Sequence, residues 1–408
     1  MPSEATSAGT QNGTEADASE QPRRTRVLIT AHTLEPPGGA SAVGAWAIQA
    51  LREQYELEVL TWRDVDLEAT NRAFGTSLEV SDAIWRTVPR SLRLLVALAP
   101  VPAALLGLGL GMRHARRLDQ IRHYDAMLGT MNELDVGRPA IQYVHYPWYA
   151  FPRPAVNLRW YHWRPAVVAY RTLATAAAGY RPERAAKNIT LVNSEWTGRV
   201  FERCYGTAVK TLYPPVAGGF PRVPFEKRHR GFVMIGRLSP EKEVEKVIDI
   251  IGAVREHGHD LTLDVVGHVD HRRYAERLFR DSRGHPWVRF HLDLPRSELT
   301  RLVATRRYGI HGMVGEHFGI APAELQRAGC ITFVPDEGGQ AEIVGGDEKL
   351  TYGSAAEAVA KIRRVVSDPA NELVLHARAL ERGELFSEER FMCGLRSVVS
   401  EFTQRCQG

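Results

Sequence analysis

Short apolar runs alternate with longer segments of helical periodicity in the first half of the chain. One apolar run spans 25–31, a glycine-containing turn follows, an amphipathic segment covers 40–52, and a second apolar run lies at 57–61. Strand, turn, helix and strand in this order are typical of a parallel sheet with crossover helices. Three further runs extend this predicted sheet, at 126–129, 140–144 and 189–193.

The alternation restarts at 231–236, after a Pro/Gly-rich linker at 213–221. Later apolar runs lie at 261–267, 288–290 and 331–334. The sequence therefore predicts an α/β protein of two Rossmann-like domains that face each other across a cleft. We expect a disordered tail over 1–25, an N-terminal domain over 26–214, a C-terminal domain over 215–385, and a final helix at 386–408 that crosses back to the N-terminal domain.

Composition narrows the class of protein. The 408 residues suit two or three domains, and the formal net charge of +4 is too small for a nucleic-acid coat, so we expect no nucleic-acid partner. The four cysteines are far apart and form no CxxC pair, which argues against a disulfide framework or zinc ribbon and fits a reducing cytoplasm. The polar first 25 residues contain no apolar core of a signal peptide.

Two stretches depart from the alternating pattern. Residues 94–112 carry no charge, and the segment 86–123 that contains them has seven Arg against one acid, Asp119, a net of 7 − 1 = +6. Residues 148–171 interleave Trp, Tyr and Phe with Arg, a composition typical of a membrane interface. We interpret 94–112 as a surface-lying or re-entrant membrane segment; the alternatives are a buried helix pair and a true span.

Two small motifs follow the first two predicted strands. Gly38 and Gly39 allow backbone amides to approach a ligand, although the pattern is not GxGxxG and a plain tight turn is the alternative. Asp64 and Asp66 have the DxD form that can hold a divalent metal. Because carboxylates also suit the start of a helix, we favour a structural role for this pair and predict no metal site.

The segment Gly236 to Lys242 indicates an anion site. Ser239 is a good N-cap and Pro240 fits the first helical position, so Lys242 is predicted in the first turn of a helix. The helix dipole disfavours a cation there. Arg237 and Lys242 together therefore predict a phosphate site, with a solvated lysine between two glutamates as the alternative.

A second candidate site spans Glu316 to Glu324. Gly319 allows a tight turn, and a helix is predicted to begin near Ile320 with free amides that could face an anion. Glu316 precedes this helix and Glu324 lies within it. A carboxylate beside a diphosphate usually accepts from sugar hydroxyls. The segment 338–342, with two glycines and Glu342, reads as a second loop of the same kind.

These motifs resemble family 4 retaining glycosyltransferases of the GT-B fold. The resemblance covers about residues 26–404 and is most specific over 231–345. Within the family, 143–147, 191–197 and 310–320 are similar to the α-1,2-mannosyltransferases that extend dolichol-linked oligosaccharides. One departure is Glu243, which stands where the family commonly has Gly.

The resemblance implies roles for the candidate residues. Glu316 would accept from a hydroxyl of the donor sugar, Glu324 would accept from the ribose, and His145 would face the sugar from the other domain. His145 and Glu316 are thus the expected catalytic residues; a hydrogen-bonded core histidine is the alternative for His145. The donor diphosphate would be held by Arg237, Lys242, the amides of Gly319 and Ile320, and the turn of Gly38 and Gly39.

The implied activity is transfer of a hexose, mannose from GDP-mannose, to a lipid-linked glycan or glycolipid, without a metal or other cofactor. The implied location is the cytoplasmic face of a membrane, as a peripheral protein. The alternatives are an inert GT-B subunit that binds a lipid or partner, and another sugar-nucleotide enzyme such as an epimerase. Without the resemblance, the residues alone predict a phosphorylated ligand in an interdomain cleft.

Overall fold

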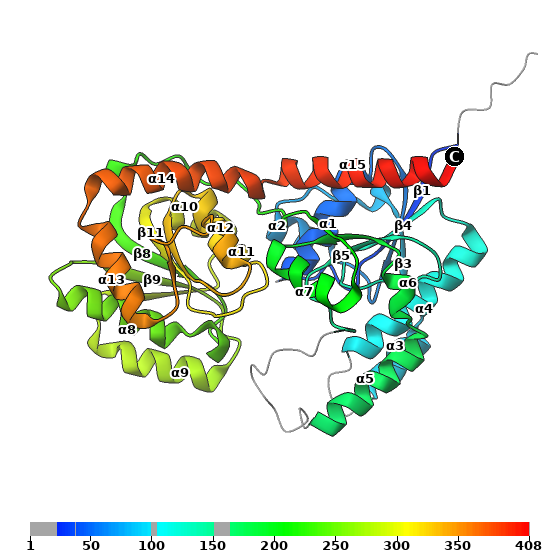
Figure 1. Ribbon diagram of the computed structural model, residues 1–408, viewed down its shortest axis with the longest axis horizontal. Coiled ribbons are helices and arrows are strands. Elements are labelled where there is room, and N and C mark those ends of the chain that lie inside the picture. The colour runs from blue at the N-terminus through cyan, green and yellow to red at the C-terminus, as the bar shows by residue number, and fades with distance from the viewer. Residues whose placement is uncertain (1–22, 37, 99–103, 151–163, 408) are drawn as a thin grey trace, which may run out of the picture.

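The computed structural model describes residues 23–36, 38–98, 104–150 and 164–407 (Figure 1). Two parallel sheets organise it, each at the centre of its own half of the molecule. The first sheet, which defines the N-domain, has the order β3-β2-β1-β4-β5-β6-β7. Its strands are β1 Arg26–Thr30, β2 Glu56–Thr61, β3 Ile84–Thr87, β4 Ala126–Gly129, β5 Ile141–Val144, β6 Ile189–Val192 and β7 Lys210–Thr211.

The second sheet defines the C-domain and has the order β10-β9-β8-β11-β12-β13. Its strands are β8 His229–Ile235, β9 Thr262–Gly267, β10 Val288–Leu292, β11 Arg306–Ile310, β12 Ile331–Pro335 and β13 Thr351–Tyr352. Helices cover both sheets, so the central strands are buried on both faces and read as continuous apolar runs. The prediction of two Rossmann-like domains is confirmed.

The N-domain helices follow the strands in the expected alternation. They are α1 Gly39–Leu51, α2 Leu67–Phe74, α3 Arg90–Ala97, α4 Ala104–Arg122, α5 Arg164–Ala178, α6 Pro182–Ala185 and α7 Glu195–Tyr205. The C-domain contributes α8 Val244–Glu256, α9 Arg272–Asp281, α10 Arg296–Ala304, α11 Ile320–Arg327, α12 Gln340–Ile343, α13 Ala355–Val366 and α14 Pro369–Gly383.

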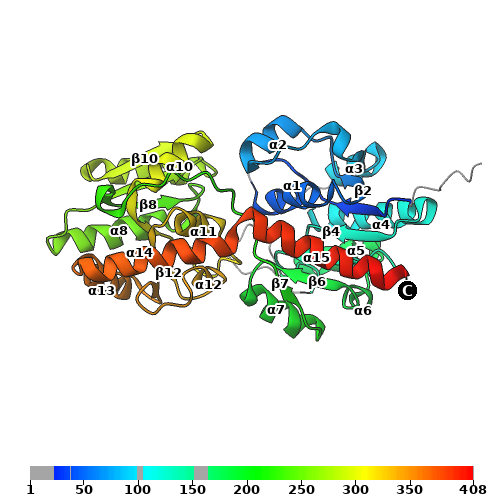
Figure 2. The ribbon, with the colours of Figure 1, turned by 90° about the horizontal axis from the view of Figure 1, so that it is seen from above.

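The last helix, α15 Glu388–Gln407, leaves the C-domain and lies along the N-domain (Figures 1 and 2). Phe391, Leu395 and Val399 enter the same apolar core as α1. The Arg396 guanidinium donates to the carbonyl of Ala50 at 2.6 Å. Helix α1 is thus covered by the sheet on one side and by α15 on the other, which explains why it is apolar on almost every face.

The segment 86–123 forms α3 and α4, and α4 packs against α5 (Figure 1). The apolar side chains Leu105, Leu110 and Met112 of α4 are buried. Close packing depends on Gly109, because a Cβ there would lie 2.6 Å from the Cβ of Ala178. None of the described helices is long and apolar enough to cross a membrane. Residues 104–112 of the predicted membrane stretch thus belong to a packed helix pair, whereas Leu94, Leu95 and Leu98 of its first part are exposed. The surface-lying interpretation of the stretch stays a prediction.

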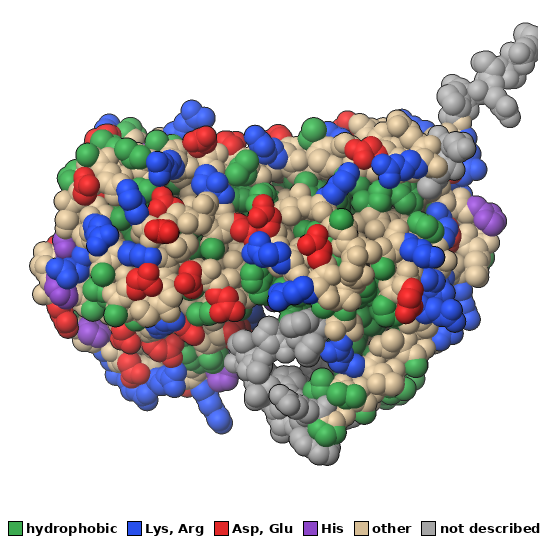
Figure 3. All heavy atoms as spheres, in the orientation of Figure 1, with side chains coloured by type: hydrophobic (Ala, Val, Ile, Leu, Met, Phe, Trp, Pro, Cys, Tyr) green, Lys and Arg blue, Asp and Glu red, His purple; other side chains and the backbone are tan. Residues whose placement is uncertain are grey.

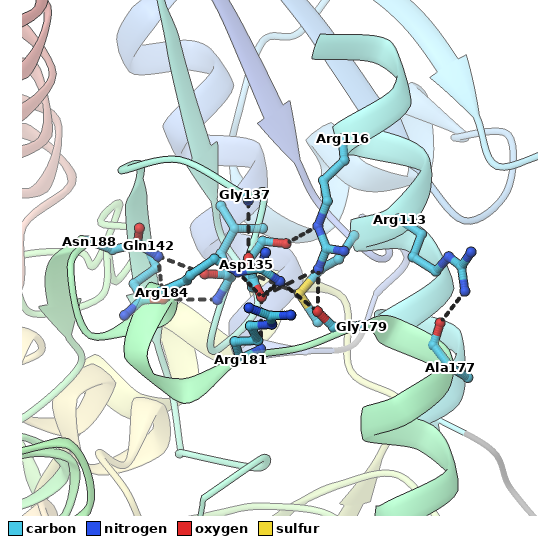
Figure 4. A network of polar contacts seen from close by, with 12 residues as sticks. Arg113, Arg116, Asp135, Gly137, Gln142, Ala177, Gly179, Arg181, Arg184 and Asn188 are labelled. Carbon is cyan, nitrogen blue, oxygen red and sulfur yellow. Dashed lines mark hydrogen bonds and ion pairs between the residues drawn. The ribbon is translucent and has the colours of Figure 1, made fainter. Parts of the chain in front are cut away.

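A network around Asp135 fixes α4 and α6 to the loop after β4 (Figure 4). Its fully buried carboxylate lies 2.8 Å from a guanidinium nitrogen of Arg184 and 3.4 Å from one of Arg116. The backbone amides of Arg181, at 2.8 Å, and Gly137, at 3.0 Å, also donate to it. A buried carboxylate needs such partners to offset its lost hydration. Helices α4 and α6 are therefore both joined by ion pairs to the loop that follows β4.

Some sequence predictions fall on undescribed residues. The tail expected at 1–25 lies outside the described residues as far as residue 22, and so do 99–103 of the uncharged stretch. The interfacial aromatic and Arg stretch is described only at 148–150 and 164–171.

Candidate active site

An ion pair joins two of the predicted site residues at the carboxyl ends of neighbouring strands. Lys242 lies in the loop after β8 and Glu316 in the loop after β11. The Lys242 Nζ donates to Glu316 Oε2 at 2.6 Å, and both side chains are mostly buried. Burial alone would raise the pKa of Glu316, but the Lys242 ammonium and the neighbouring His311 outweigh burial and hold it well below its usual range. Glu316 is therefore a fixed negative charge.

His311, at the end of β11, completes this group and was not singled out from the sequence. Its Nε2 lies 3.5 Å from Glu316 Oε2, and the side chain is almost fully buried. Burial lowers the pKa of His311, an effect that the Glu316 carboxylate opposes. The sequence contained little signal for it, because the preceding strand β11 reads RRYGI and was not predicted as a strand.

The backbone at Lys242 differs from the prediction. Residues Pro240–Lys242 form one short 3₁₀ turn, and the helix α8 begins only at Val244. Between them, Glu243 has a φ of +50°, and the hydroxyl of Ser239 makes no capping hydrogen bond. Lys242 is thus not in the first turn of an α-helix, and the helix-dipole argument for it was wrong. A left-handed backbone conformation favours glycine, which explains why the family commonly has Gly at the position of Glu243.

Arg237 lies apart from the ion pair of Lys242 and Glu316. Its guanidinium is about half exposed and donates to Asp270 at 2.8 Å and to Glu241 at 3.2 Å. Both acids would have to share Arg237 with any phosphate that it contacts. Its role in holding a diphosphate stays a prediction.

Four other predicted residues surround one cavity between the domains. This cavity, of about 220 Å³, is lined by Gly38 and Gly39 at the start of α1 and by Ile320 and Glu324 of α11. A Cβ on Gly39 would lie 3.3 Å from Ile320 Cγ1. Glu324 is buried and forms an ion pair with Arg296, which also lines the cavity.

The start of α11 has the geometry that the sequence predicted. Gly319 precedes the helix with a φ of +103°, a conformation that L-residues rarely adopt, and α11 begins at Ile320. The first amides of a helix have no carbonyl partners within it. Gly319 therefore turns the chain from the Glu316 loop so that α11 starts at the interdomain cavity.

His145 follows β5, as predicted, but its ring makes a hydrogen bond within the N-domain. The Nε2 lies 3.0 Å from the carbonyl oxygen of Thr130, so Nε2 carries the hydrogen. Burial lowers the pKa of His145 to about 4. The imidazole is therefore neutral at pH 7 and has Nδ1 unprotonated.

Contact between the domains is made by the residues next to the predicted ones. The Tyr146 ring stacks on His317 with centroids 4.3 Å apart, and Trp196 lies against the same imidazole at 5.8 Å. These three residues were missed, because each is a single ring, two in loops and Trp196 in the first turn of α7, with no pattern around it. The stack of Tyr146 on His317 brings the loop that carries His145 close to the loop that carries Glu316.

Hydrogen bonds at the start of α7 complete this interdomain clasp, which consists of 194–196 and Tyr146 against His317 and Glu342. The Ser194 hydroxyl donates to the His317 carbonyl at 2.6 Å. Glu342 accepts from the amides of Glu195 at 2.8 Å and Trp196 at 2.6 Å, and burial raises its pKa. Glu342, predicted in a second ligand loop, thus caps a helix of the other domain.

Asp66 has a structural role. Its Oδ1 accepts from the Ala69 amide at 2.9 Å and caps α2. Among the residues described, no group of three His, Cys, Asp or Glu side chains is placed to hold a metal ion.

Comparison with known proteins agrees with this geometry. Residues 220–382 match the family model of group 1 glycosyl transferases. Two curated relatives, from Neurospora crassa and Candida glabrata, are named GDP-Man:Man(3)GlcNAc(2)-PP-Dol alpha-1,2-mannosyltransferase. The first is 24% identical over 51% of this chain and 44% of its own length, and the second is 28% identical over 36% and 32%. The chain spans less than half the length of these relatives.

Solved structures share the fold over nearly the whole chain. Anabaena HepE in complex with UDP-glucose has a TM-score of 0.64 at 17% identity, over 92% of this chain and 99% of that one. The lipopolysaccharide glycosyltransferase WaaG has a TM-score of 0.62 at 14% identity, over 88% and 95%. The resemblance predicted from the motifs at 236–242 and 316–324 is confirmed, and so is the GT-B fold.

Proposed function

We propose that this protein, whose residues 220–382 belong to the group 1 glycosyl transferases, is a retaining glycosyltransferase that binds a nucleotide sugar between its two domains. The observation that carries the proposal is the buried ion pair of Lys242 and Glu316 at the carboxyl edge of the C-domain sheet. Ligands of open α/β sheets bind at this edge. Gly38, Gly39 and Ile320 line the cavity between the domains, where their backbone amides would face the diphosphate.

Breaking a sugar–phosphate bond builds negative charge on the departing diphosphate and positive character on the sugar. The Lys242 ammonium and the first amides of α11 would stabilise the diphosphate, an effect that usually contributes most to such catalysis. Glu316, ionised because of its neighbours, would accept from a sugar hydroxyl. The acceptor oxygen would bond to the anomeric carbon from the face that the diphosphate leaves, as the sugar–phosphate bond breaks, and the departing phosphate would take the acceptor's proton.

The proposed donor is GDP-mannose and the proposed acceptor a lipid-linked glycan. The names of the curated relatives support both choices, as do the segments 143–147 and 191–197. His145, neutral at pH 7, would present an uncharged ring and its backbone to the sugar.

The acceptor's lipid suggests a peripheral position on the cytoplasmic face of a membrane. The exposed apolar side chains Leu94 and Leu95 of α3, Leu98 directly after it, and Val168 and Leu173 of α5 support this position. In Figure 3, Lys and Arg side chains gather at the right-hand edge and hydrophobic ones at the lower right of the N-domain. Each basic residue near anionic lipid contributes about 1 kcal/mol.

The test of the activity is a transfer assay read by mass spectrometry. The protein is incubated with an isoprenoid-linked oligosaccharide and, in separate reactions, GDP-mannose, UDP-glucose and UDP-N-acetylglucosamine. We expect one added hexose with GDP-mannose. An inert subunit would give neither transfer nor donor hydrolysis, an epimerase would change the sugar without moving it, and either result would refute the proposal.

The membrane position is tested by liposome flotation. We expect the protein to float with anionic vesicles at low salt and to be released partly by high salt, because screening weakens the Arg contribution. Protein that stays at the bottom with anionic vesicles at low salt would rule out this position and favour a soluble acceptor.

A further inference from the structure

The loop 145–149, which follows β5 and carries His145 and Tyr146, rests on two acceptor side chains from the loop after β4. Asn132 Oδ1 accepts from the amides of both His145 and Tyr146 at 3.0 Å. Glu133 accepts from the amides of Trp148 at 2.9 Å and Tyr149 at 2.8 Å. Neighbouring residues of one loop thus collect four backbone donors of the other.

The backbone conformation of Asn132 fixes its side chain in this position. It has a φ of +62°, its side chain is buried, and its amide donates to the Tyr143 carbonyl at 3.0 Å. Asparagine is among the few non-glycine residues that tolerate this conformation. The turn therefore directs the side chains of Asn132 and Glu133 toward the loop 145–149.

Glu133 is unusual because its carboxylate is buried and forms no ion pair within the part of the chain that the structure describes. Only 3% of the residue is exposed, and among the described residues no basic side chain forms an ion pair with it. By contrast Glu372, equally buried in the C-domain, lies 3.1 Å from a guanidinium nitrogen of Arg307. Isolated buried carboxylates are costly unless hydrogen bonds replace their hydration. The Glu133 carboxylate has such bonds from backbone amides and from the Tyr205 hydroxyl at 3.0 Å.

Among the described residues, the nearest cation of this loop is directed elsewhere, since the Arg171 guanidinium donates to the carbonyl of Tyr149 at 2.5 Å. The titratable residues that couple to Glu133 are Tyr149, Tyr180, Tyr205 and Cys204, whose pKa values are raised by burial and then by the Glu133 charge itself. Asp135, two residues away, is already paired with Arg116 and Arg184. Burial raises the pKa of Glu133 to about 7. Its charge therefore changes close to neutral pH.

We propose that Glu133 is a positioning residue, whose ionised carboxylate gathers the amides of Trp148 and Tyr149 and so holds His145 and Tyr146 against the Glu316–His317 loop. This inference rests on the proposed function for its link to turnover. When the carboxyl group is protonated, it loses acceptor capacity and gains a donor that faces other donors. The loop 145–149 then loosens, and Tyr146 leaves its stack on His317.

Stability and activity depend on the Glu133 charge in opposite directions. Because its pKa is raised in the folded state, its contribution to stability is fully present below the unfolded pKa near 4.5 and is lost as pH rises through about 7. The catalytic arrangement needs the ionised form, so kcat rises over the same interval. An ionised group that lowers folding stability but is needed for turnover is typical of a residue retained for function.

The experiment uses Glu133→Gln, with Glu372→Gln as the matched buried-carboxylate control. Hydrogen exchange of the peptide covering 145–150, corrected for intrinsic rates, is followed from pH 6 to pH 8, and kcat with GDP-mannose is measured alongside. In the wild type we expect protection and kcat to rise together with pH. In Glu133→Gln we expect kcat to fall at least about tenfold, the scale of a charge-assisted hydrogen bond, and the pH dependence to vanish. Glu372→Gln should behave as wild type.

A second variant guards against misfolding of Glu133→Gln. Tyr205→Phe on α7 removes one donor to the carboxylate, so both pH curves should move to higher pH with the same upper limit. Unaltered exchange in Glu133→Gln, unaltered kcat, or unmoved curves in Tyr205→Phe would each overturn the inference. A wild type that transfers no sugar at any pH would instead refute the proposed function, while the exchange data would still judge the role of Glu133 in holding the loop.

Discussion

Glu316 stays ionised at low pH because an ammonium and an imidazole lie against it. Glu324, only eight residues later, is held by Arg296 at the other side of the α11 start. The two glutamates of one motif are therefore in separate electrostatic environments, which suits separate parts of one donor. Their spacing was readable from the sequence, but two of their partners, His311 and Arg296, were not identified from it.

The roles of the two glutamates can be separated by substitution. Glu324→Gln should weaken binding of free GDP by about 1.5–3 kcal/mol, since it removes a charged hydrogen-bond acceptor for the ribose. Glu316→Gln should spare GDP binding and lower kcat, because its contact is with the sugar. Calorimetry and steady-state kinetics measure the two effects. Equal loss of GDP affinity in both variants would contradict the assignment.

The buried neutral His145 predicts a pH effect on stability. Its pKa is lowered to about 4, so its contribution to stability is present above the unfolded pKa near 6.5 and is lost as pH falls toward 4. His145→Asn keeps a donor for Thr130 and removes the titration, so stability should fall less steeply with acid in this variant. Urea unfolding at pH 7 and pH 5 measures the slope, with the exposed His229→Asn as control. Equal slopes in wild type and His145→Asn would exclude the buried neutral state.

At the scale of elements, apolar runs predicted most of the central strands, but not β11 Arg306–Ile310, which begins with two arginines, nor the outer strands β3, β7 and β13. The start of α8 was missed because it depends on one backbone angle. Parallel strands are buried on both faces, so their composition is visible in the sequence. The left-handed Glu243 is not visible, because glutamate rarely adopts that conformation and nothing local requires it. This is why the 3₁₀ turn that carries Lys242 was mistaken for the first turn of α8.

Relief of this strain gives a stability prediction. Glu243→Gly should raise the free energy of unfolding by about 0.5–1 kcal/mol, because glycine tolerates a φ of +50° at little cost. The ion pair of Glu243 with Lys246 is partly exposed and contributes little. Urea unfolding measures the change. Glu243→Ala, which loses the ion pair but keeps the strain, should not be stabilised; equal stabilisation of both variants would contradict the explanation.

At the scale of the whole molecule, the interdomain clasp and α15 hold the two domains together, with the cavity between them. The clasp was not predicted from the sequence, because capping of α7 by Glu342 joins segments 147 residues apart. The crossing of the final helix to the N-domain, by contrast, was expected from the sequence. The sequence did identify Gly38, Gly39, Ile320 and Glu324 of the cavity lining, since the local motifs around them mark a turn or the first half of a helix. The local motifs were readable, and their partners across the cleft were not.

The clasp is testable in solution. Glu342→Ala leaves the amides of Glu195 and Trp196 without their acceptor, so the domains should separate and the radius of gyration from small-angle X-ray scattering should increase. The exposed Glu348→Ala is the control. An unchanged scattering profile in Glu342→Ala would mean that the clasp does not hold the domains together.

The central claim is that a nucleotide-sugar diphosphate binds at Lys242 between the domains. Calorimetric titration of GDP-mannose into the wild type and into Lys242→Ala tests it most directly, with Lys361→Ala, a lysine of the same domain paired with Glu357, as control. We predict that Lys242→Ala loses about 1.5–3 kcal/mol of binding free energy, the scale of a charge-assisted hydrogen bond, and that Lys361→Ala loses none. Equal affinity in all three proteins, or no binding by the wild type, would contradict the claim.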